Sequence, residues 1–245
     1  TGAIEERVRE VVGVGGGASQ RLSVRIDKDH VTLSLDASGD ALYMRGWRTE
    51  TVSAPIRETL AAALVLWSGW DAKAPFVDPC CGSGTLAIEA AALARRLPPG
   101  RQRSFAWQEW PIAAGVDWAK LTAAADADVR PSGPTVMMSD VDGEAVEIAR
   151  RNATRAGVDV ESATCSADDV IRPSRPGWIV TNPPYGERIG AELRRVYESV
   201  GRLAMEPWHL AVVAAVGTPT SAFGRDWADS LHTRNGGLPV RFLRV

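Results

Sequence analysis

The feature that most constrains the fold is an alternation of short apolar runs and longer helical patterns, which begins near residue 50 of this 245-residue chain. Strands that alternate with helices indicate a parallel, doubly wound sheet, because each helix returns the chain to the same end of the sheet. Two further strands flank Asn235-Gly236-Gly237, a strong hairpin signal that predicts an antiparallel addition to the sheet. The expected strands are residues 75–77, 135–138, 160–165, 178–180, 210–216, 231–234 and 238–245, and the expected helices are residues 56–67, 86–97, 144–156 and 193–205.

The first fifty residues have a different pattern, with few apolar positions. A short amphipathic helix is expected over residues 4–12, followed by a glycine-rich turn over 13–17 and two alternating strands at 22–26 and 31–35. So few apolar residues make a poor independent core, so we expect this segment to be part of a small α+β domain. The predicted division of the chain is residues 1–50 and residues 51–245.

Four strand ends carry polar or glycine-rich turns. Ligands of a doubly wound sheet bind beyond the carboxyl ends of the strands, so these turns are expected to converge on one edge. The turns are Asp78-Pro-Cys-Cys-Gly-Ser-Gly-Thr85, Ser139-Asp-Val-Asp142, Ser166-Ala-Asp-Asp169 and Asn182-Pro-Pro-Tyr185.

Their chemistry favours a cationic ligand that carries hydroxyl groups. The glycine turn lacks both the GxGxxG pattern and a phosphate-binding lysine, and the aspartates are hostile to pyrophosphate. Gly82 and Gly84 allow a ligand to approach the backbone closely. Asp140 can accept hydrogen bonds from both ribose hydroxyls, Asp168 can accept one from an adenine amine, and Asp78 would lie near an ammonium group. S-adenosylmethionine combines a sulfonium, an ammonium, a ribose and an adenine, and is therefore the predicted cofactor.

Some of these residues also have plain structural interpretations. Asp142 precedes a helix and is more typical of an N-cap than of a ligand contact. Asp169 can be an ordinary loop carboxylate, and Gly82 and Gly84 alone would be a weak signal. The glycine run at residues 13–17 follows a helix and not a strand, so we interpret it as a linker.

The segment WIVTNPPYGER, residues 178–188, ends a strand at a rigid corner. Proline biases the preceding residue toward an extended conformation, so Asn182 is held at the strand end. Pro183 and Pro184 fix the backbone and offer carbonyl oxygens without N–H groups. The oxygens of Asn182 and Pro183 can accept both hydrogens of an –NH2 group, and Tyr185 offers a stacking face. Such a grip favours a pyramidal nitrogen that can attack a sulfonium methyl, with catalysis by positioning and electrostatics.

The motifs DPCCGSGT, IEAA, SDVD and NPPYGER resemble those of class I S-adenosylmethionine-dependent amino-methyltransferases. In particular they resemble the THUMP-linked RNA methylases, which include guanine-N2 methyltransferases of ribosomal and transfer RNA. The resemblance covers most of the chain: residues 34–48 are similar to the end of the RNA-binding THUMP module, residues 54–65 to a helix before the glycine strand, and residues 98–110 to an insertion. It implies a seven-stranded Rossmann-like sheet, preceded by a partial THUMP-like segment in residues 1–50.

The motif chemistry and the resemblance together assign the candidate residues. The catalytic candidates are Asn182, Pro183, Pro184 and Tyr185. The cofactor-binding candidates are Asp78, Cys80, Gly82, Ser83, Gly84, Thr85, Asp140, Val141, Asp168, Asn182 and Thr59. A helical core position is an equal alternative for Thr59, and Glu89 either supports the glycine loop or faces solvent. No metal site is expected.

The substrate side is defined by arginines near tryptophans, a combination that suits single-stranded or flipped-out nucleic acid. Arg188, Arg101 and Arg103 are the candidate RNA contacts, and a solvated helix face with buried tryptophans is the alternative. The net charge of −2 gives no global basic signal for nucleic acid.

We therefore predict an RNA N-methyltransferase that acts on an exocyclic amine, with guanine N2 of ribosomal or transfer RNA as the leading candidate. Adenine N6 of DNA or RNA, and a protein glutamine N5, fit the same corner. A catalytically silent RNA-binding or assembly factor is the alternative of another class. The three cysteines form no disulfide framework, and no apolar run approaches the ~20 residues of a membrane span, so a cytoplasmic protein, expected as a monomer, is favoured.

Overall fold

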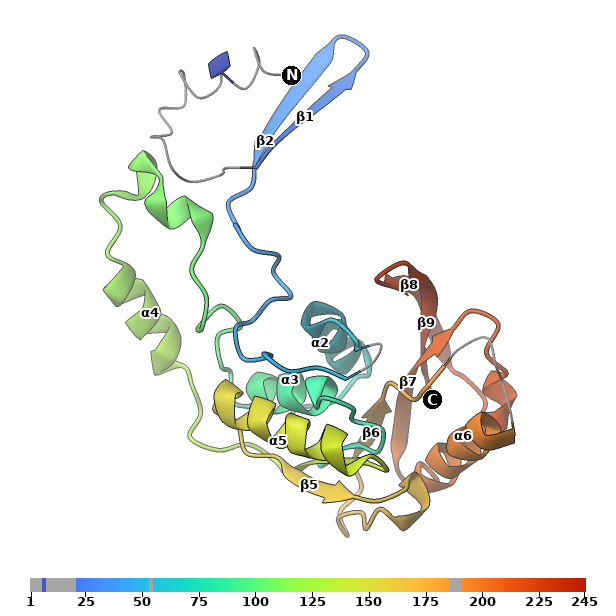
Figure 1. Ribbon diagram of the computed structural model, residues 1–245. Coiled ribbons are helices and arrows are strands. Elements are labelled where there is room, and N and C mark those ends of the chain that lie inside the picture. The colour runs from blue at the N-terminus through green and yellow to red at the C-terminus, as the bar shows by residue number, and fades with distance from the viewer. Residues whose placement is uncertain (1–5, 8–20, 53–54, 186–190) are drawn as a thin grey trace.

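The computed structural model describes residues 6–7, 21–52, 55–185 and 191–245. Its centre is a seven-stranded sheet in the order β5-β4-β3-β6-β7-β9-β8, in which only the pairings made by β9 are antiparallel (Figure 1). The predicted doubly wound α/β sheet with its closing hairpin is thereby confirmed. The strands are β3 (Phe76–Asp78), β4 (Val136–Asp140), β5 (Glu161–Thr164), β6 (Trp178–Thr181), β7 (His209–Ala215), β8 (Asp229–Asn235) and β9 (Leu238–Arg244).

Both faces of the sheet are covered by helices, which explains the nearly continuous apolar runs of its strands. Neighbouring strand residues pack into opposite cores: Phe76 and Val180 contact one helical layer, whereas Val77 and Ile179 contact the other. The first layer contains α2 (Glu58–Trp67), α3 (Thr85–Ala94) and α5 (Gly143–Ala156), and the second contains α6 (Ala191–Leu203) and the 3-10 turns η3 (Ala167–Asp169) and η4 (Thr220–Phe223).

The strand order places a topological switch point between β3 and β6. From β3 the chain moves outward through β4 to β5, and it then returns to β6 on the opposite side of β3. Crossover connections diverge at such a point and leave a crevice at the carboxyl ends of the strands. Asp78 ends β3 and Asn182 follows β6, so two of the predicted site residues flank this crevice.

Several element boundaries differ from the prediction. Strand β4 extends to Asp140, two residues further than expected. Helix α3 ends at Ala94 and not at residue 97, because Arg96 adopts a left-handed φ of 57° ahead of Pro98 and Pro99. Helix α5 ends at Gly157 with a φ of 70°, as predicted.

One helix was not predicted at all. Helix α4 (Trp118–Ala127) lies between α3 and β4, after the 3-10 turns η1 (Ala106–Glu109) and η2 (Pro111–Ala113), and none of its residues is buried. The sequence signals for this helix were local ones: an N-cap aspartate, Asp117, and a run of alanines, which favour helix. In the structure the Asp117 side chain accepts a hydrogen bond from the Lys120 N–H at 2.9 Å. Without an apolar stripe, periodicity could not reveal this helix.

The two predicted N-terminal strands are present, and they form a ribbon of their own. Strands β1 (Leu22–Asp27) and β2 (His30–Leu35) pair with each other and project away from the large sheet (Figure 1). The helix expected over residues 4–12 and the linker at 13–17 fall largely outside the described residues. The boundary at residue 50 stays a prediction, although Trp47 is buried in the core of the larger sheet. Among the described helices, none has the length and apolarity that a lipid bilayer requires.

Candidate active site

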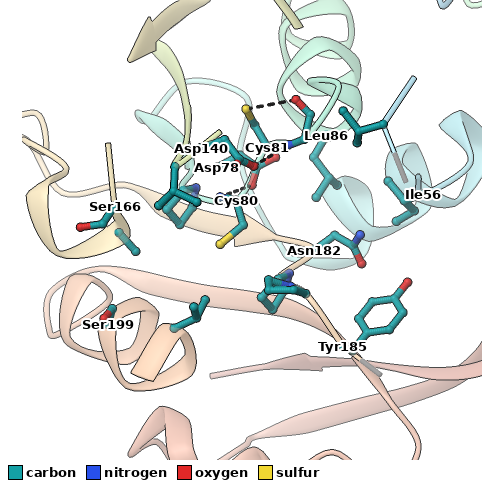
Figure 2. A pocket seen from close by; sticks show the side chains of 18 of the residues that line it. Ile56, Asp78, Cys80, Cys81, Leu86, Asp140, Ser166, Asn182, Tyr185 and Ser199 are labelled. Atoms are coloured by element: carbon teal, nitrogen blue, oxygen red, sulfur yellow. Dashed lines mark hydrogen bonds between the residues drawn. The ribbon is translucent and has the colours of Figure 1, made fainter. Parts of the chain in front are cut away.

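A cavity of about 660 Å³ lies at the carboxyl ends of β3, β4 and β6. The glycine turn, the acidic turns and the Asn182–Tyr185 corner all line it, so the predicted convergence of the four turns is observed (Figure 2). Residues before α2 and the first half of α6 complete the walls. Of the candidates, Asp78, Cys80, Gly82, Ser83, Thr85, Asp140, Val141, Asp168, Asn182, Pro183, Pro184 and Tyr185 line the cavity.

The glycine turn is held in place by the neighbouring strand. The Gly82 N–H donates to Asp140 Oδ2 at 2.9 Å, and the Cys81 N–H donates to the Ser139 carbonyl at 2.9 Å. Gly82 adopts a φ of 50°, a conformation that favours glycine. Asp140 accepts a second bond from the Asp142 N–H, so its carboxylate fixes two turns at once. Asp142 itself caps α5 through the Glu144 N–H, which confirms the N-cap interpretation.

Gly84 has a packing function behind the cavity and does not line it. Its φ is 85°, and a Cβ atom at this position would lie 2.9 Å from Cβ of Ala149 on α5. This close approach lets α3 start directly against α5. The described geometry thus gives Gly84 a helix-packing function, and its cofactor contact stays a prediction.

Asp78 is a buried carboxylate with one free oxygen. Its Oδ1 accepts hydrogen bonds from Thr181 Oγ1 at 2.6 Å and from the Cys80 N–H at 3.3 Å. Its Oδ2 has no hydrogen-bond partner within the described part of the chain. Burial raises the pKa of Asp78 to about 7, against the lowering effect of the bond from Thr181. A bound ammonium group would satisfy the free oxygen and return the carboxylate to its charged form.

Asp168 lines the cavity, but its carboxylate is turned toward α6. It accepts bonds from Ser199 Oγ at 2.8 Å and from Arg202 at 2.8 Å, and the Arg202 bond lowers its pKa. An adenine amine would therefore have to share oxygens that are already hydrogen-bonded. Asp169 accepts from Ser166 Oγ within its own turn, which confirms the loop-carboxylate interpretation.

The Asn182 corner is fixed by two side chains that sequence reasoning missed. The Tyr197 hydroxyl on α6 donates to the Pro184 carbonyl at 2.8 Å. Asn235 Nδ2, at the end of β8, donates to the Tyr185 hydroxyl at 2.9 Å. Asn182 Oδ1 is buried and has no hydrogen-bond partner among the residues described. The corner thus combines a rigid backbone with an acceptor that is available to an amine. Tyr197 was hidden in an apolar stripe, and Asn235 was interpreted only as a turn residue.

The cavity wall also contains two charged residues from the N-terminal half of α6. Glu192 and Arg195 both line the cavity and are exposed. Neither side chain is hydrogen-bonded or ion-paired to another described residue. Neither residue was among the candidates drawn from the sequence. The spacing of three residues on a helix was the available signal, since it places both on one side.

Three of the remaining candidates that the structure describes lie elsewhere, and a fourth is not described. Thr59 is exposed on α2 and does not line the cavity, so neither its cofactor contact nor its core alternative is observed; Ile56 lines the cavity instead. Arg101 forms an ion pair with Asp126 of α4, in which Arg101 Nε lies 3.7 Å from Asp126 Oδ1. Arg103 donates to the carbonyls of Ser38, Asp40 and Ala41, so its guanidinium fixes the chain that follows β2. Arg188 falls outside the described residues.

Comparison with known proteins connects this geometry to one family. The model of the family UPF0020, described as RMKL-like, methyltransferase domain, matches residues 45–241. YpsC of Bacillus subtilis (strain 168), a provisionally named RNA methyltransferase, is 36% identical over 236 residues. Ribosomal RNA large subunit methyltransferase K/L of Syntrophotalea carbinolica is 41% identical over 243 residues. The matches cover 93% and 91% of this chain, but only 61% and 34% of the two relatives.

Two solved structures are similar to this chain over almost its whole length. The crystal structure of SMU.472 in complex with SAH has a TM-score of 0.84 and 32% identity, and the match covers 99% of this chain and 67% of that one. TrmN of Thermus thermophilus has a TM-score of 0.70 with 18% identity, over 98% of this chain and 64% of that one, and supports the fold alone.

Proposed function

The chain belongs to the RMKL-like methyltransferase domain family UPF0020, and we propose that it methylates the exocyclic N2 amine of guanine in RNA. Its methyl donor is S-adenosylmethionine, which supplies an electrophilic methyl group when bound. The observation that carries the proposal is the pairing of two open acceptors in one cavity. Within the described part of the chain, Asp78 Oδ2 is free for an ammonium group, and Asn182 Oδ1 is free for an amine.

On the donor side, the proposed contacts follow from the free and bonded atoms. Asp78 would bind the ammonium of the methionine part through its open oxygen. Asp140 would accept hydrogen bonds from the ribose hydroxyls while it holds the Gly82 N–H. Asp168 would lie at the adenine end, with Arg202 holding its carboxylate in place. Gly82 leaves room for the ligand at the loop backbone.

On the acceptor side, the corner would hold the amine and orient it. Asn182 Oδ1 and the Pro183 carbonyl accept its two hydrogens, and Tyr185 stacks on the base. The bonds from Tyr197 and Asn235 keep these groups in place before the substrate arrives, so little reorganisation is needed. Asn182 has no basic form, so the proton that the nitrogen loses after transfer passes to water.

Guanine is favoured over adenine by the two charged residues of α6. The Watson–Crick edge of guanine presents the N2 amine, the N1–H donor and the O6 acceptor in that order. Next to the amine corner, Glu192 would accept from N1–H, and Arg195 would donate to O6. Adenine instead presents an N1 acceptor beside its amine, which a carboxylate would repel. This assignment is supported by the absence of any partner for either side chain among the described residues.

RNA as the substrate is supported by the named relatives. The Bacillus subtilis and Syntrophotalea carbinolica proteins are an RNA and a ribosomal RNA methyltransferase by name, which favours ribosomal RNA over transfer RNA. We further propose that residues 1–50 are part of a THUMP-like RNA-binding segment. The exposed ribbon of β1 and β2 is consistent with a piece of a larger module.

The test is mass spectrometry of nucleosides from ribosomal and transfer RNA of cells with and without this protein. Loss of N2-methylguanosine from one RNA supports the proposal, and loss of N6-methyladenosine would replace guanine by adenine. Calorimetry with S-adenosylmethionine distinguishes the enzyme from a silent RNA-binding factor, because a silent factor need not bind the cofactor at millimolar concentration.

Base choice is tested separately with Glu192→Gln. The amide can present an N–H to an N1 acceptor, so discrimination against adenine should weaken while S-adenosylmethionine affinity is unchanged. The measurement is the ratio of kcat/KM for guanine- and adenine-containing RNA. An unchanged ratio would remove Glu192 from base recognition, and Glu198→Gln on the same helix serves as the control because Glu198 pairs with Arg194 away from the cavity lining.

A further inference from the structure

Residues 45–50 lead from the N-terminal ribbon toward the cavity and are bonded to all three helices of the first layer. Trp47 is buried in the core that these helices share. Arg45 pairs with Glu89 of α3, Arg48 pairs with Glu58 of α2, and Glu50 pairs with Arg151 and Arg155 of α5. This segment, which we call the strap, therefore has a fixed position against the methyltransferase sheet. Glu89 is accordingly a buried ion-pair partner and not a solvent-facing residue.

Arg48 is the residue of the strap that acts directly on the cavity wall. Its guanidinium donates to the Ile56 carbonyl at 2.8 Å and to Thr85 Oγ1 at 3.4 Å. A third contact places it 2.9 Å from Glu58 Oε2, in an ion pair. Ile56 and Thr85 both line the cavity, one ahead of α2 and the other at the start of α3. One side chain thus joins two segments of the wall that are far apart in sequence.

Because Arg48 and Glu58 are both buried, a contribution to stability alone does not explain why this ion pair is present. The side chains of Arg48 and Glu58 are 12% and 3% exposed, and burial raises the pKa of Glu58. Desolvation of two buried charges commonly offsets their attraction, and apolar replacements of both partners are often neutral for stability. A guanidinium differs from an apolar side chain in one respect: its fixed fork donates in several directions at once.

A second bond from the strap reaches the same wall independently. Asn152 of α5 is fully buried, and its Nδ2 donates to the Glu50 carbonyl at 3.1 Å and to the Ser83 carbonyl at 3.0 Å. Ser83 lies in the glycine turn and lines the cavity. The strap is therefore bonded to the donor side at two points, one through Arg48 and one through Asn152.

We propose that Arg48 is a positioning residue for the methyl donor: it holds Ile56 and Thr85 in the arrangement that S-adenosylmethionine requires, and so links the strap to donor affinity. The proposal rests on the cavity being the donor site. Its failure is distinguishable from the failure of that assignment, because a wild-type protein that binds no donor would refute the assignment itself.

The test compares two buried Arg–Glu pairs of the same strap. Arg48→Met/Glu58→Met leaves no unpaired buried charge, so its melting temperature should stay close to the wild-type value. Its dissociation constant for S-adenosylmethionine should rise about tenfold, the order expected for lost hydrogen bonds from a charged group. The matched control is Arg45→Met/Glu89→Met, because this pair is similarly buried, but among the described residues Arg45 donates only to Glu89 and Leu42, which do not line the donor cavity. The control should retain donor affinity.

Arg48→Lys provides a second measurement in a chain that keeps the charge beside Glu58. An ammonium cannot reach the carbonyl, the hydroxyl and the carboxylate in one fork geometry, so donor KM should rise several-fold with kcat nearly unchanged. Wild-type affinity in either Arg48 variant would overturn the proposal, as would an equal loss of affinity in the control pair. If the double variant does not fold, the Arg48→Lys result decides.

Discussion

The two walls of the cavity are built in opposite ways. On the donor wall, backbone N–H groups of the glycine turn are bonded to the neighbouring strand and to Asp140, and Asn152 and Arg48 hold the turn from behind. On the proposed acceptor wall, one corner is anchored by two side chains, while Glu192 and Arg195, which we assign to the same wall, have no side-chain partner in the described ranges. Under the proposed function, this difference means that the cofactor site is formed in advance, whereas base recognition is completed only by the substrate.

The substitution Asn182→Ala should distinguish the functions of the two walls most clearly. The change removes the open acceptor on the amine side and leaves every donor-wall bond in place. We expect turnover to fall by about 100- to 1,000-fold, as for removal of a preorganised electrostatic group, with S-adenosylmethionine affinity within a factor of about two. Single-turnover kinetics and calorimetry on the same sample measure the two effects. Near-normal turnover would exclude the assigned function of Asn182.

The complementary change on the donor wall is Asp140→Ala. Loss of the carboxylate removes both the ribose contact and the bond that fixes the Gly82 N–H. Donor affinity should weaken by about 1–3 kcal/mol, the range for hydrogen bonds to a charged group. Asp142→Ala is the control, because it removes the α5 N-cap while leaving the ribose contact. An unchanged dissociation constant for Asp140→Ala would mean that another residue binds the ribose.

The pH dependence of donor binding tests the buried acid of the same wall. Because the pKa of Asp78 is about 7 in the free protein, the carboxyl is protonated below that pH and cannot pair with an ammonium group. Affinity should fall as pH decreases below about 7, by at most about tenfold per pH unit, and level off above it. Calorimetry in buffers of different ionisation enthalpy should detect proton release on binding, and Asp78→Asn should abolish both effects.

The same shift in the pKa of Asp78 also makes the stability of the ligand-free protein depend on pH, in the opposite direction to donor affinity. The folded state binds the Asp78 proton more tightly than the unfolded chain, in which the carboxyl has the ordinary aspartate pKa of 3.8. The free energy of unfolding should therefore decrease as pH rises from about 4 to about 7 and then stay level. Glu89, with its pKa raised to about 7 by burial, adds to this trend but not to donor binding. Persistence of the binding effect in Asp78→Asn would point to another group.

The smallest expected effect concerns an anchor of the acceptor wall. Tyr197→Phe keeps the buried ring and deletes the hydroxyl, with its bonds to the Pro184 carbonyl and the Thr218 side chain. A loss of about 0.5–1.5 kcal/mol in transition-state stabilisation is expected, which lowers kcat/KM for RNA up to about tenfold. Donor affinity should not change. If donor affinity falls with kcat/KM, the two walls are not independent of each other.

The sequence predicted those parts of the site that depend on topology. Asp78, Asp140 and Asn182 each end a strand or follow it directly, and a doubly wound sheet brings such positions to one edge. Local periodicity is sufficient for this step, because the handedness of the crossovers leaves few alternative arrangements.

Side-chain pairing was not predictable in the same way. Asp168 is bonded to Arg202, which lies 34 residues away, and Arg103 is bonded to carbonyls more than 60 residues away. Which side chains become partners depends on how two packed elements are oriented. A helix that is rotated by one residue position presents different side chains to its neighbour. Arg103 was assigned to RNA because it lies near tryptophans in the sequence, but in the structure its guanidinium donates to the protein's own backbone.

The Tyr185–Asn235 bond has a consequence for the order in which the enzyme matures. The corner and its anchor are separated by 50 residues of chain, and β9 must enter between β7 and β8 before the end of β8 is in place. During synthesis the donor turns are made well before this hairpin. A nascent chain can therefore form the cavity first. Under the proposed function, it would become competent to methylate only when the hairpin has folded onto the corner. Transfer activity would thus begin late in biogenesis, after the sheet has closed.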